Sequence, residues 1–181
     1  MLLVVLAAAL AGCGGPEGGR AVPAPGARQP AELPPRPREL PVRGADPCAL
    51  LTERQLDELG VNSRPRRDGA ACSFDADRAE PFHSYVVEVI GDADVRAWLD
   101  GDRASATVAT ESGEVVGFPA VTRYRPGGRA ADCEVLVGVA DGQTLRTQAY
   151  PISAGAFDQR QLCARAERAA AMAVATLAGE G

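Results

Sequence analysis

The sequence predicts an α+β fold: an antiparallel sheet with short helices and a C-terminal helix packed on one side, held by two disulfides. Residues 82–90 alternate their side chains between two faces, as a β-strand does. Further strand-like segments follow, and the turns Gly127-Gly128 and Asp141-Gly142 separate the last three. The second of these turns is a strong hairpin signal. Residues 158–177 instead repeat apolar side chains at helical spacing.

The first helix is predicted by its capping residues. Thr52 is a good N-cap, and Gln55 three residues later completes a capping box. Gly60 suits the position just past a helix end, where the backbone becomes left-handed. We therefore expect a short helix over residues 53–59.

The other elements follow from alternation and helical spacing. A polar, Arg-rich loop is expected over residues 62–69. We expect strands at 71–74, 82–90, 106–110, 115–116 with 118–124, 133–139 and 145–150, and helices ending near Leu99 and over 158–177. The last helix carries a stripe formed by Cys163, Ala166, Ala170, Val174 and Leu177, whose small members would allow close approach to a sheet.

The N-terminus is typical of an exported protein. The apolar run 2–10 has the length of a signal-peptide core and is too short to span a bilayer, which takes about 20 apolar residues. It ends in Leu10-Ala11-Gly12-Cys13, which resembles the lipobox of bacterial lipoproteins. We therefore expect residues 1–12 to be a signal peptide and Cys13 to be lipidated, anchoring the protein at the extracytoplasmic face of the cell membrane. A plain cleaved signal peptide is the alternative, and it also leaves the protein exported.

Residues 13–45 are predicted to be a disordered linker behind the lipidated Cys. Eight of the 14 prolines fall in this Pro- and Gly-rich segment, which has few large apolar residues. Such a segment cannot bury enough surface to offset its ordering entropy. We expect a spacer, followed by a single domain over residues 46–181.

Four cysteines remain beyond Cys13, an even number that is typical of disulfides in an exported domain. Four cysteines allow three pairings, and we favour Cys48–Cys72 and Cys133–Cys163. The first would tie the start of the first helix to the adjacent strand, and the second would pin the C-terminal helix to the sheet. A zinc site does not fit the spacing, because no CxxC or CxxH occurs.

The segment Asp46–Thr52, followed by a helix ending in Gly and by Cys72 with an aromatic residue two positions later, resembles the actinobacterial lipoproteins catalogued as domain of unknown function 3558. The Gly117–Ala120 turn and the cysteines at 133 and 163 also fit. The resemblance extends from Asp46 to about Leu177. It implies an exported lipoprotein, and it offers no activity or site residues to carry over.

Two groups of arginines are the candidate partner-binding residues. They are Arg64, Arg66 and Arg67 in one loop, and Arg123, Arg125 and Arg129 near the end of one strand. If they converge, they could hold a phosphate or carboxylate group of the cell envelope. The alternative is dispersed surface charge.

Catalytic and metal sites are weakly supported. His83 is the only histidine. The four cysteines beyond Cys13 are assigned to disulfides, so none of them is a nucleophile that His83 could activate. The aspartates at 92, 94, 100 and 102 lack the regular spacing of an EF-hand, so we interpret them as caps and surface charge. We expect no catalytic residue, no metal and no cofactor.

These observations favour a non-enzymatic binding or accessory module at the cell envelope. A carrier that encloses a lipid-like or other small envelope ligand in an apolar pocket is the alternative, and a hydrolase is less favoured. The membrane is the expected partner through the lipid anchor, together with an envelope protein or lipid-like ligand. A nucleic-acid partner is not expected, because the formal net charge is −5 and phosphate neutralisation needs a basic surface.

Overall fold

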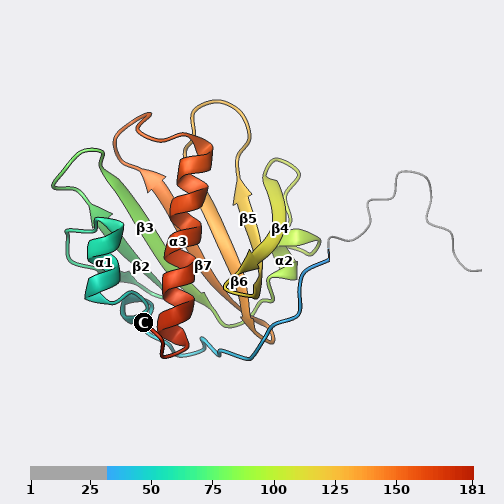
Figure 1. Ribbon diagram of the computed structural model, residues 1–181. Coiled ribbons are helices and arrows are strands. Elements are labelled where there is room, and N and C mark those ends of the chain that lie inside the picture. Colours follow the sequence, from blue (N-terminus) through green and yellow to red (C-terminus); the bar gives the residue numbers. More distant parts are fainter. Residues whose placement is uncertain (1–31) are drawn as a thin grey trace, which may run out of the picture.

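The computed structural model describes residues 32–181, which form an antiparallel sheet in the strand order β1-β2-β3-β7-β6-β5-β4 (Figure 1). The strands are β1 (Arg66–Asp68), β2 (Ala71–Ala76), β3 (His83–Ile90), β4 (Ala109–Val115), β5 (Phe118–Tyr124), β6 (Cys133–Ala140) and β7 (Gln143–Pro151). The helices are the 3-10 turn η1 (Pro47–Ala49), α1 (Glu53–Leu59), α2 (Arg96–Leu99) and α3 (Gln159–Leu177). The predicted fold class is confirmed. The predicted signal peptide, Cys13 and the linker up to residue 31 lie outside the described residues.

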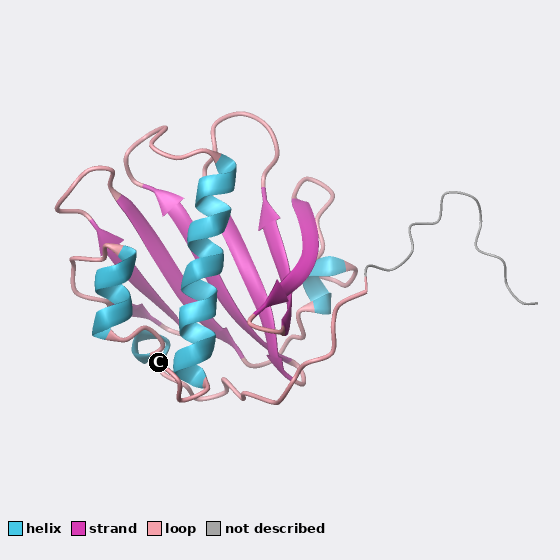
Figure 2. Ribbon diagram, in the orientation of Figure 1, coloured by secondary structure: helices cyan, strands magenta, loops and turns pink. Residues whose placement is uncertain are grey.

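Helices α1 and α3 pack on one face of the sheet, with α3 running across its middle (Figure 2). The capping box of α1 is present: Gln55 N–H donates to the Thr52 hydroxyl, and Thr52 N–H donates to the Gln55 side chain at 2.8 Å. The inward side of α3 is made of alanines that have no exposed surface, Ala166, Ala169, Ala170 and Ala173. Their size lets the helix backbone approach the sheet closely, so that the Thr147 hydroxyl donates to the carbonyl of Ala166 at 2.8 Å.

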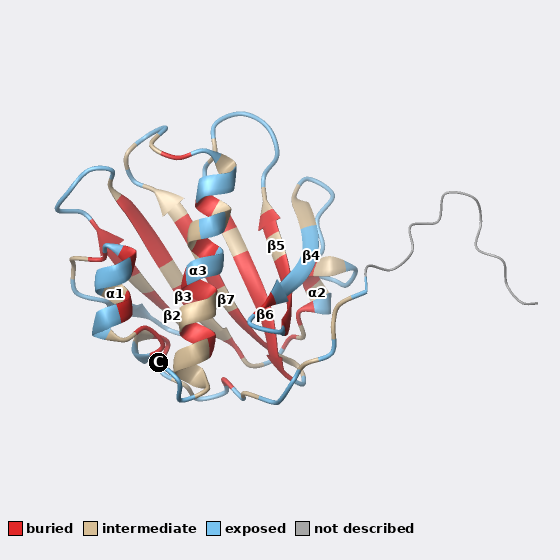
Figure 3. Cartoon of the chain, in the orientation of Figure 1, coloured by how far each residue is buried: buried red, intermediate tan, exposed pale blue. Residues whose placement is uncertain are grey.

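Helix α2 differs from α1 and α3 because it packs on the opposite face of the sheet. Its Trp98 belongs to a small apolar cluster with Ile90 and Leu136, whose side chains alternate away from α3. This cluster covers only one end of that face. We call the rest of this face, on the side of the sheet away from α1 and α3, the open face. Figure 3 is seen from the helix-covered side, and the open face is turned away from the viewer. Within residues 32–181, no helix is both long and apolar enough to cross a bilayer.

The prediction of a disordered linker up to residue 45 is wrong for residues 33–42, which we call the strap. The strap runs along one end of the sheet (blue in Figure 1), where Leu40 N–H donates to the carbonyl of Val139 at 2.8 Å. Val42 has no exposed surface and joins the main core. Leu40 and Val42 lie among many prolines, and two apolar residues are a weak signal of burial in a sequence. In the structure both pack in or against the main core.

Two strands were not predicted correctly. β1 lies within the segment expected to be a loop, and all three of its residues are exposed. The strand expected over 106–110 is instead β4, which continues through the polar residues 111–114. β4 pairs with β5 through a hairpin turn at Val116-Gly117. β1 and β4 are the two edge strands, and their side chains are largely exposed. They therefore lack the alternation that identifies half-buried strands.

Both predicted disulfides are present, Cys48–Cys72 and Cys133–Cys163. They join residues 24 and 30 positions apart. Cross-links over such loops stabilise a fold by roughly 3–4 kcal/mol each on the chain-entropy model. The second one fixes α3 to β6, and so fixes the helix layer to the centre of the sheet.

Candidate functional site: the charged open face of the sheet

The open face carries charged side chains in the centre of the sheet, where most sheets carry apolar ones. Strand pairing places Glu88 of β3 opposite Arg146 of β7, and Gln148 of β7 opposite Glu134 of β6. The next pair along the same row is Glu134 and Arg123 of β5. Alternation within each strand directs these side chains away from α3 and onto one surface.

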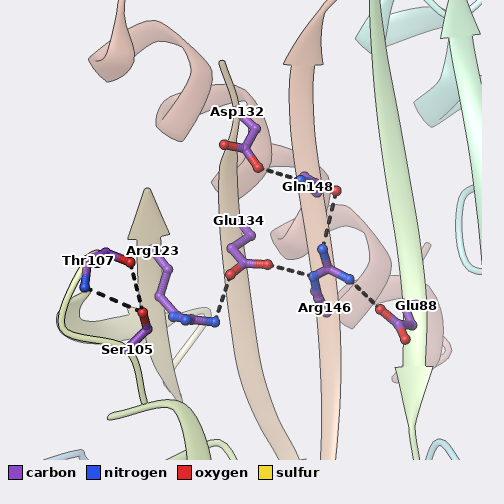
Figure 4. A network of polar contacts seen from close by, with 8 residues as sticks. All are labelled: Glu88, Ser105, Thr107, Arg123, Asp132, Glu134, Arg146 and Gln148. Atoms are coloured by element: carbon purple, nitrogen blue, oxygen red, sulfur yellow. Dashed lines mark hydrogen bonds and ion pairs between the residues drawn. The ribbon is translucent and has the colours of Figure 1, made fainter. Parts of the chain in front are cut away.

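These residues form a continuous ionic network across four adjacent strands (Figure 4). Arg146 donates from Nη1 to Glu88 at 2.6 Å and from Nε to Glu134 at 2.7 Å. The second carboxylate oxygen of Glu134 accepts from Arg123 Nη1 at 2.8 Å. Glu134 is therefore shared by two guanidinium groups, and each interaction holds its neighbour in place.

The network also controls the charge of its central arginine. Burial by itself lowers the pKa of Arg146, but the negative charges and hydrogen bonds of Glu134 and Glu88 outweigh burial and raise the pKa above its ordinary value. Arginine is cationic throughout the physiological range, and the two carboxylates compensate for the burial of this charge. Arg146 holds the two carboxylates apart and fixes their orientation.

A hollow with a volume of about 550 Å³ lies over this network. The residues that matter for its chemistry are Arg123, Arg125, Asp132, Glu134, Arg146 and Tyr150. Arg123 is only 8 % exposed, and its Nε has no hydrogen-bond partner among the described residues. Arg125 is exposed and forms no ion pair within residues 32–181. The hollow therefore offers cationic donors to an acceptor that comes from outside.

The structure separates the six arginines that we proposed as partner-binding residues. Arg123 and Arg125 line the hollow together, whereas Arg129 lies near Gly155 in the loop before α3. Arg66 and Arg67 belong to β1, at the far edge of the sheet from β5, and Arg64 is exposed just before that strand. The two groups therefore do not converge on one site.

The arginines at the β1 edge are already engaged. Arg66 forms an ion pair with Asp75 of β2. Arg67 lies 3.4 Å from a carboxylate oxygen of Asp46 and donates to the carbonyl of Gly69 at 3.2 Å. Because these contacts tie the edge strand to the domain, they have a structural role.

His83 does not form a catalytic dyad with the buried hydroxyl of its neighbour Ser84. Ser84 donates to Asp75 at 2.6 Å, but both side chains point to the open face. His83 is the preceding residue, and it points to the opposite face, where its Nδ1 lies 2.8 Å from the Pro81 carbonyl. The sheet therefore separates the imidazole from this serine.

The prediction that an aspartate caps α2 is wrong, because the residue at the N-cap position is Val95, and Asp94 and Asp92 instead form local polar contacts. Asp94 accepts from the backbone N–H of Arg96 at 3.0 Å and lies 3.4 Å from Arg36 of the strap. Asp92 lies 3.8 Å from Arg103. Within residues 32–181, no group of three or more His, Cys, Asp or Glu side chains is arranged to hold a metal ion.

Sequence reasoning missed most of the network, namely Glu88, Asp132, Glu134, Arg146 and Gln148, and it missed Tyr150, which lines the hollow. The available signal was a charged residue within an apolar strand, as with Glu134 in β6. A strand buried on one face rarely carries such a residue without a partner. Finding the partner requires the register between strands that are not adjacent in sequence.

No curated protein and no solved structure matches the chain. The family model described as "Protein of unknown function (DUF3558)" matches residues 8–176. The match covers nearly all of the chain, including both disulfides and the whole ionic network. The chain therefore belongs to the DUF3558 family of proteins of unknown function.

Proposed function

We propose that this protein is a non-enzymatic binding module at the cell envelope, anchored to the outer side of the membrane by lipid on Cys13. Its partner engages the hollow on the open face through a phosphate or carboxylate group. The observation that carries the proposal is Arg125, an exposed cation that lines the hollow and forms no ion pair within residues 32–181. A phosphate or carboxylate that enters the hollow can pair with its guanidinium group through two hydrogen bonds.

Three arginines (Arg123, Arg125 and Arg146) and two carboxylates (Asp132 and Glu134) line the hollow, and this surplus of one positive charge favours an anionic partner group. Glu134 is neutralised from both sides by Arg123 and Arg146. Arg125 at the rim adds positive charge that no ion pair within residues 32–181 cancels. Tyr150 lines the same hollow and supplies a hydroxyl. These groups suit an oxyanion that is gripped by guanidinium and hydroxyl donors together.

The packing of α3 favours a binding module over a carrier with an internal pocket. The inward-facing alanines of α3 and the strand residues Val135 and Leu145 have no exposed surface. The space between this helix and the sheet is therefore filled by side chains. The open face, in contrast, is polar around the hollow, where the hydrogen bonds of the network hold the side chains in place. Side chains that are already held lose little freedom when a partner binds, which suits recognition.

The tether in this proposal is shorter than the predicted linker. Because the strap packs on the domain from residue 33, the spacer consists of residues 14–32. A fully extended chain rises by about 3.3–3.6 Å per residue, so this spacer reaches roughly 60 Å. The module then searches a thin layer above the membrane, where an envelope partner is met at high effective concentration.

The experiment compares two neighbouring arginines in the same loop. Arg125→Ala removes the cation of the hollow that forms no ion pair within residues 32–181, whereas Arg129→Ala removes an equal charge outside the hollow. Wild type and both variants are used to recover partners from host envelope extract, with a melting curve for each. We expect Arg125→Ala to lose partners that Arg129→Ala retains, at unchanged melting temperature. Equal recovery by both variants would contradict the proposal, and so would hydrolysis of an envelope ester or glycan by the pure protein.

A further inference from the structure

A second cleft lies on the helix-covered side of the sheet, between α1 and α3. Its volume is about 340 Å³. Leu59, Phe157 and Ala164 form its apolar wall, and Tyr85, Arg165 and Arg168 supply its polar groups. The sheet separates this cleft from the open face, so it is a different site.

Arg165 lies at the centre of the cleft and is held on three sides. Its guanidinium carbon lies 4.3 Å from the centroid of the Phe157 ring. Its Nη1 donates to the Tyr85 hydroxyl at 3.1 Å and lies 3.3 Å from His83 Nε2. Stacking and hydrogen bonding together fix the plane of the guanidinium.

His83 acts as a support for Arg165. Because Nδ1 lies 2.8 Å from the Pro81 carbonyl, which can only accept, Nδ1 carries a proton. Nε2 is then the acceptor of the ring, and it accepts from Arg165 Nη1.

The charge of Arg165 is not balanced within the described residues. Arg168, one turn further along α3, lies 3.3 Å from Glu58 of α1. Arg165 is half-buried and forms no ion pair with a carboxylate anywhere in residues 32–181. A cation that is partly removed from water without a counter-ion is unfavourable. The cleft therefore favours an anion that supplies the missing charge.

The free donors of Arg165 match the shape of a carboxylate. Its hydrogen bonds to protein all leave from Nη1, so Nε and Nη2 remain without an acceptor in the described part of the chain. These two N–H groups are parallel and fit the two oxygens of a carboxylate. The Tyr85 hydroxyl accepts from Arg165 and keeps its own proton to donate.

We propose that this cleft binds a small organic monocarboxylate with an apolar substituent. The carboxylate lies on Nε and Nη2 of Arg165, and the substituent lies against Leu59 and Phe157. The C-terminus of a short peptide and a short fatty acid share this chemistry. Glu58 at the rim disfavours multiply charged ligands such as phosphates. The proposal is independent of the open face, because it uses other residues on the other side of the sheet.

The test titrates the purified, oxidised full-length protein with four probes and follows the amide signals by NMR. The probes are N-acetyl-alanyl-alanine, its C-terminal amide, hexanoate and inorganic phosphate. We expect saturable binding of one or both carboxylates, with the larger shifts near Arg165 and Leu59. The dipeptide amide should bind at least about tenfold more weakly than the free acid, because it cannot complete the ion pair. Which of the two carboxylates binds identifies the source of the ligand.

Two substitutions on α3 provide the matched comparison. Arg165→Gln should weaken carboxylate binding at least about tenfold, whereas Arg160→Gln, which removes an exposed charge from the first turn of the same helix, should leave it unchanged. The proposal is overturned if neither carboxylate binds, if acid and amide bind equally, or if phosphate binds more tightly than both. Equal binding by Arg165→Gln and wild type overturns it as well. If Arg165→Gln does not fold, the comparison of acid and amide on the wild type decides alone.

Discussion

Arg146 on β7 donates to Glu134 on β6 across 2.7 Å, and the second oxygen of that carboxylate is held by Arg123 on β5. One carboxylate thus joins three strands in the centre of the sheet. Both arginines rely on Glu134 to balance their charge. Arg123 relies on it more, because Arg123 is almost fully buried.

Replacing Glu134 with Gln should destabilise the fold by about 3 kcal/mol, because it leaves the buried Arg123 charge unpaired. Urea denaturation measures the change in the free energy of unfolding. Glu114→Gln is the control, since Glu114 is exposed on β4 and forms no ion pair within residues 32–181. The control should change stability by less than about 0.5 kcal/mol. A Glu134→Gln protein as stable as the control would show that the network contributes little.

The hairpin turn between β4 and β5 contains a residue that does not suit it. Val116 has a φ of 51° and is 58 % exposed. A β-branched residue is disfavoured in the left-handed region by about 1–2 kcal/mol, whereas Asn adopts it readily. We expect Val116→Asn to stabilise the protein by about 1 kcal/mol in urea denaturation.

The matched control for Val116 is Ile152→Asn, which also removes an exposed apolar side chain but at a residue without a positive φ. Stabilisation should appear only at Val116. If both substitutions raise stability equally, the gain comes from lost apolar exposure, and the backbone explanation is wrong.

The strap should loosen in acid. The hydrogen bond from Arg36, together with the one from Asp141 N–H, holds the pKa of Glu39 below its ordinary value of 4.5. A carboxylate with a lowered folded pKa stabilises the fold above its unfolded pKa, and this contribution is lost as the pH falls through the folded value. Hydrogen exchange of the Leu40 amide should therefore accelerate below about pH 4.5, beyond the intrinsic effect of pH.

Glu39→Gln separates this effect from general acid unfolding. Gln is uncharged at every pH, so the extra acceleration at Leu40 should disappear. A central amide such as that of Val137 should keep the same pH profile in both proteins. Identical profiles for Leu40 in wild type and variant would assign the loosening to other carboxylates.

Cys13→Ala tests the anchor. Two or more acyl chains give stable membrane attachment, so their loss should move the protein from the membrane fraction to a soluble or unprocessed form. Fractionation followed by immunoblotting measures the distribution. Ser63→Ala, a change far along the chain in the folded domain, serves as the control and should stay with the membranes. An unchanged distribution of Cys13→Ala would exclude the lipobox interpretation.

Local signals in the sequence were enough to predict much of the fold. Thr52 with Gln55 located α1, and the position of Cys163 in the helical stripe led to the correct pairing with Cys133. β4 was misplaced because an edge strand with exposed side chains shows no alternation. The strap was missed because its burial depends on residues far along the chain, such as Val139 and Gln143, which accept hydrogen bonds from its backbone. Such features are determined by tertiary packing rather than by neighbouring residues.

The candidate site was predicted only in part, for a related reason. Arg123 and Arg125 are close in sequence, so they were found as a group. Their partners Glu134 and Arg146 become neighbours only through the order of the strands. No pattern within a single strand indicates that Glu134 is shared by two arginines.

The central claim is that the hollow beside Arg125 is the surface that meets an envelope partner. A photoreactive phenylalanine analogue in place of Ala131, an exposed residue lining the hollow, tests it most directly in intact host cells. The same analogue at Glu167, exposed on α3 across the sheet, is the control. We predict a discrete adduct from position 131 that is absent at 167 and is lost when Arg125→Ala is added. Adducts of equal yield from both positions, or an adduct at 131 that survives Arg125→Ala unchanged, would contradict the claim.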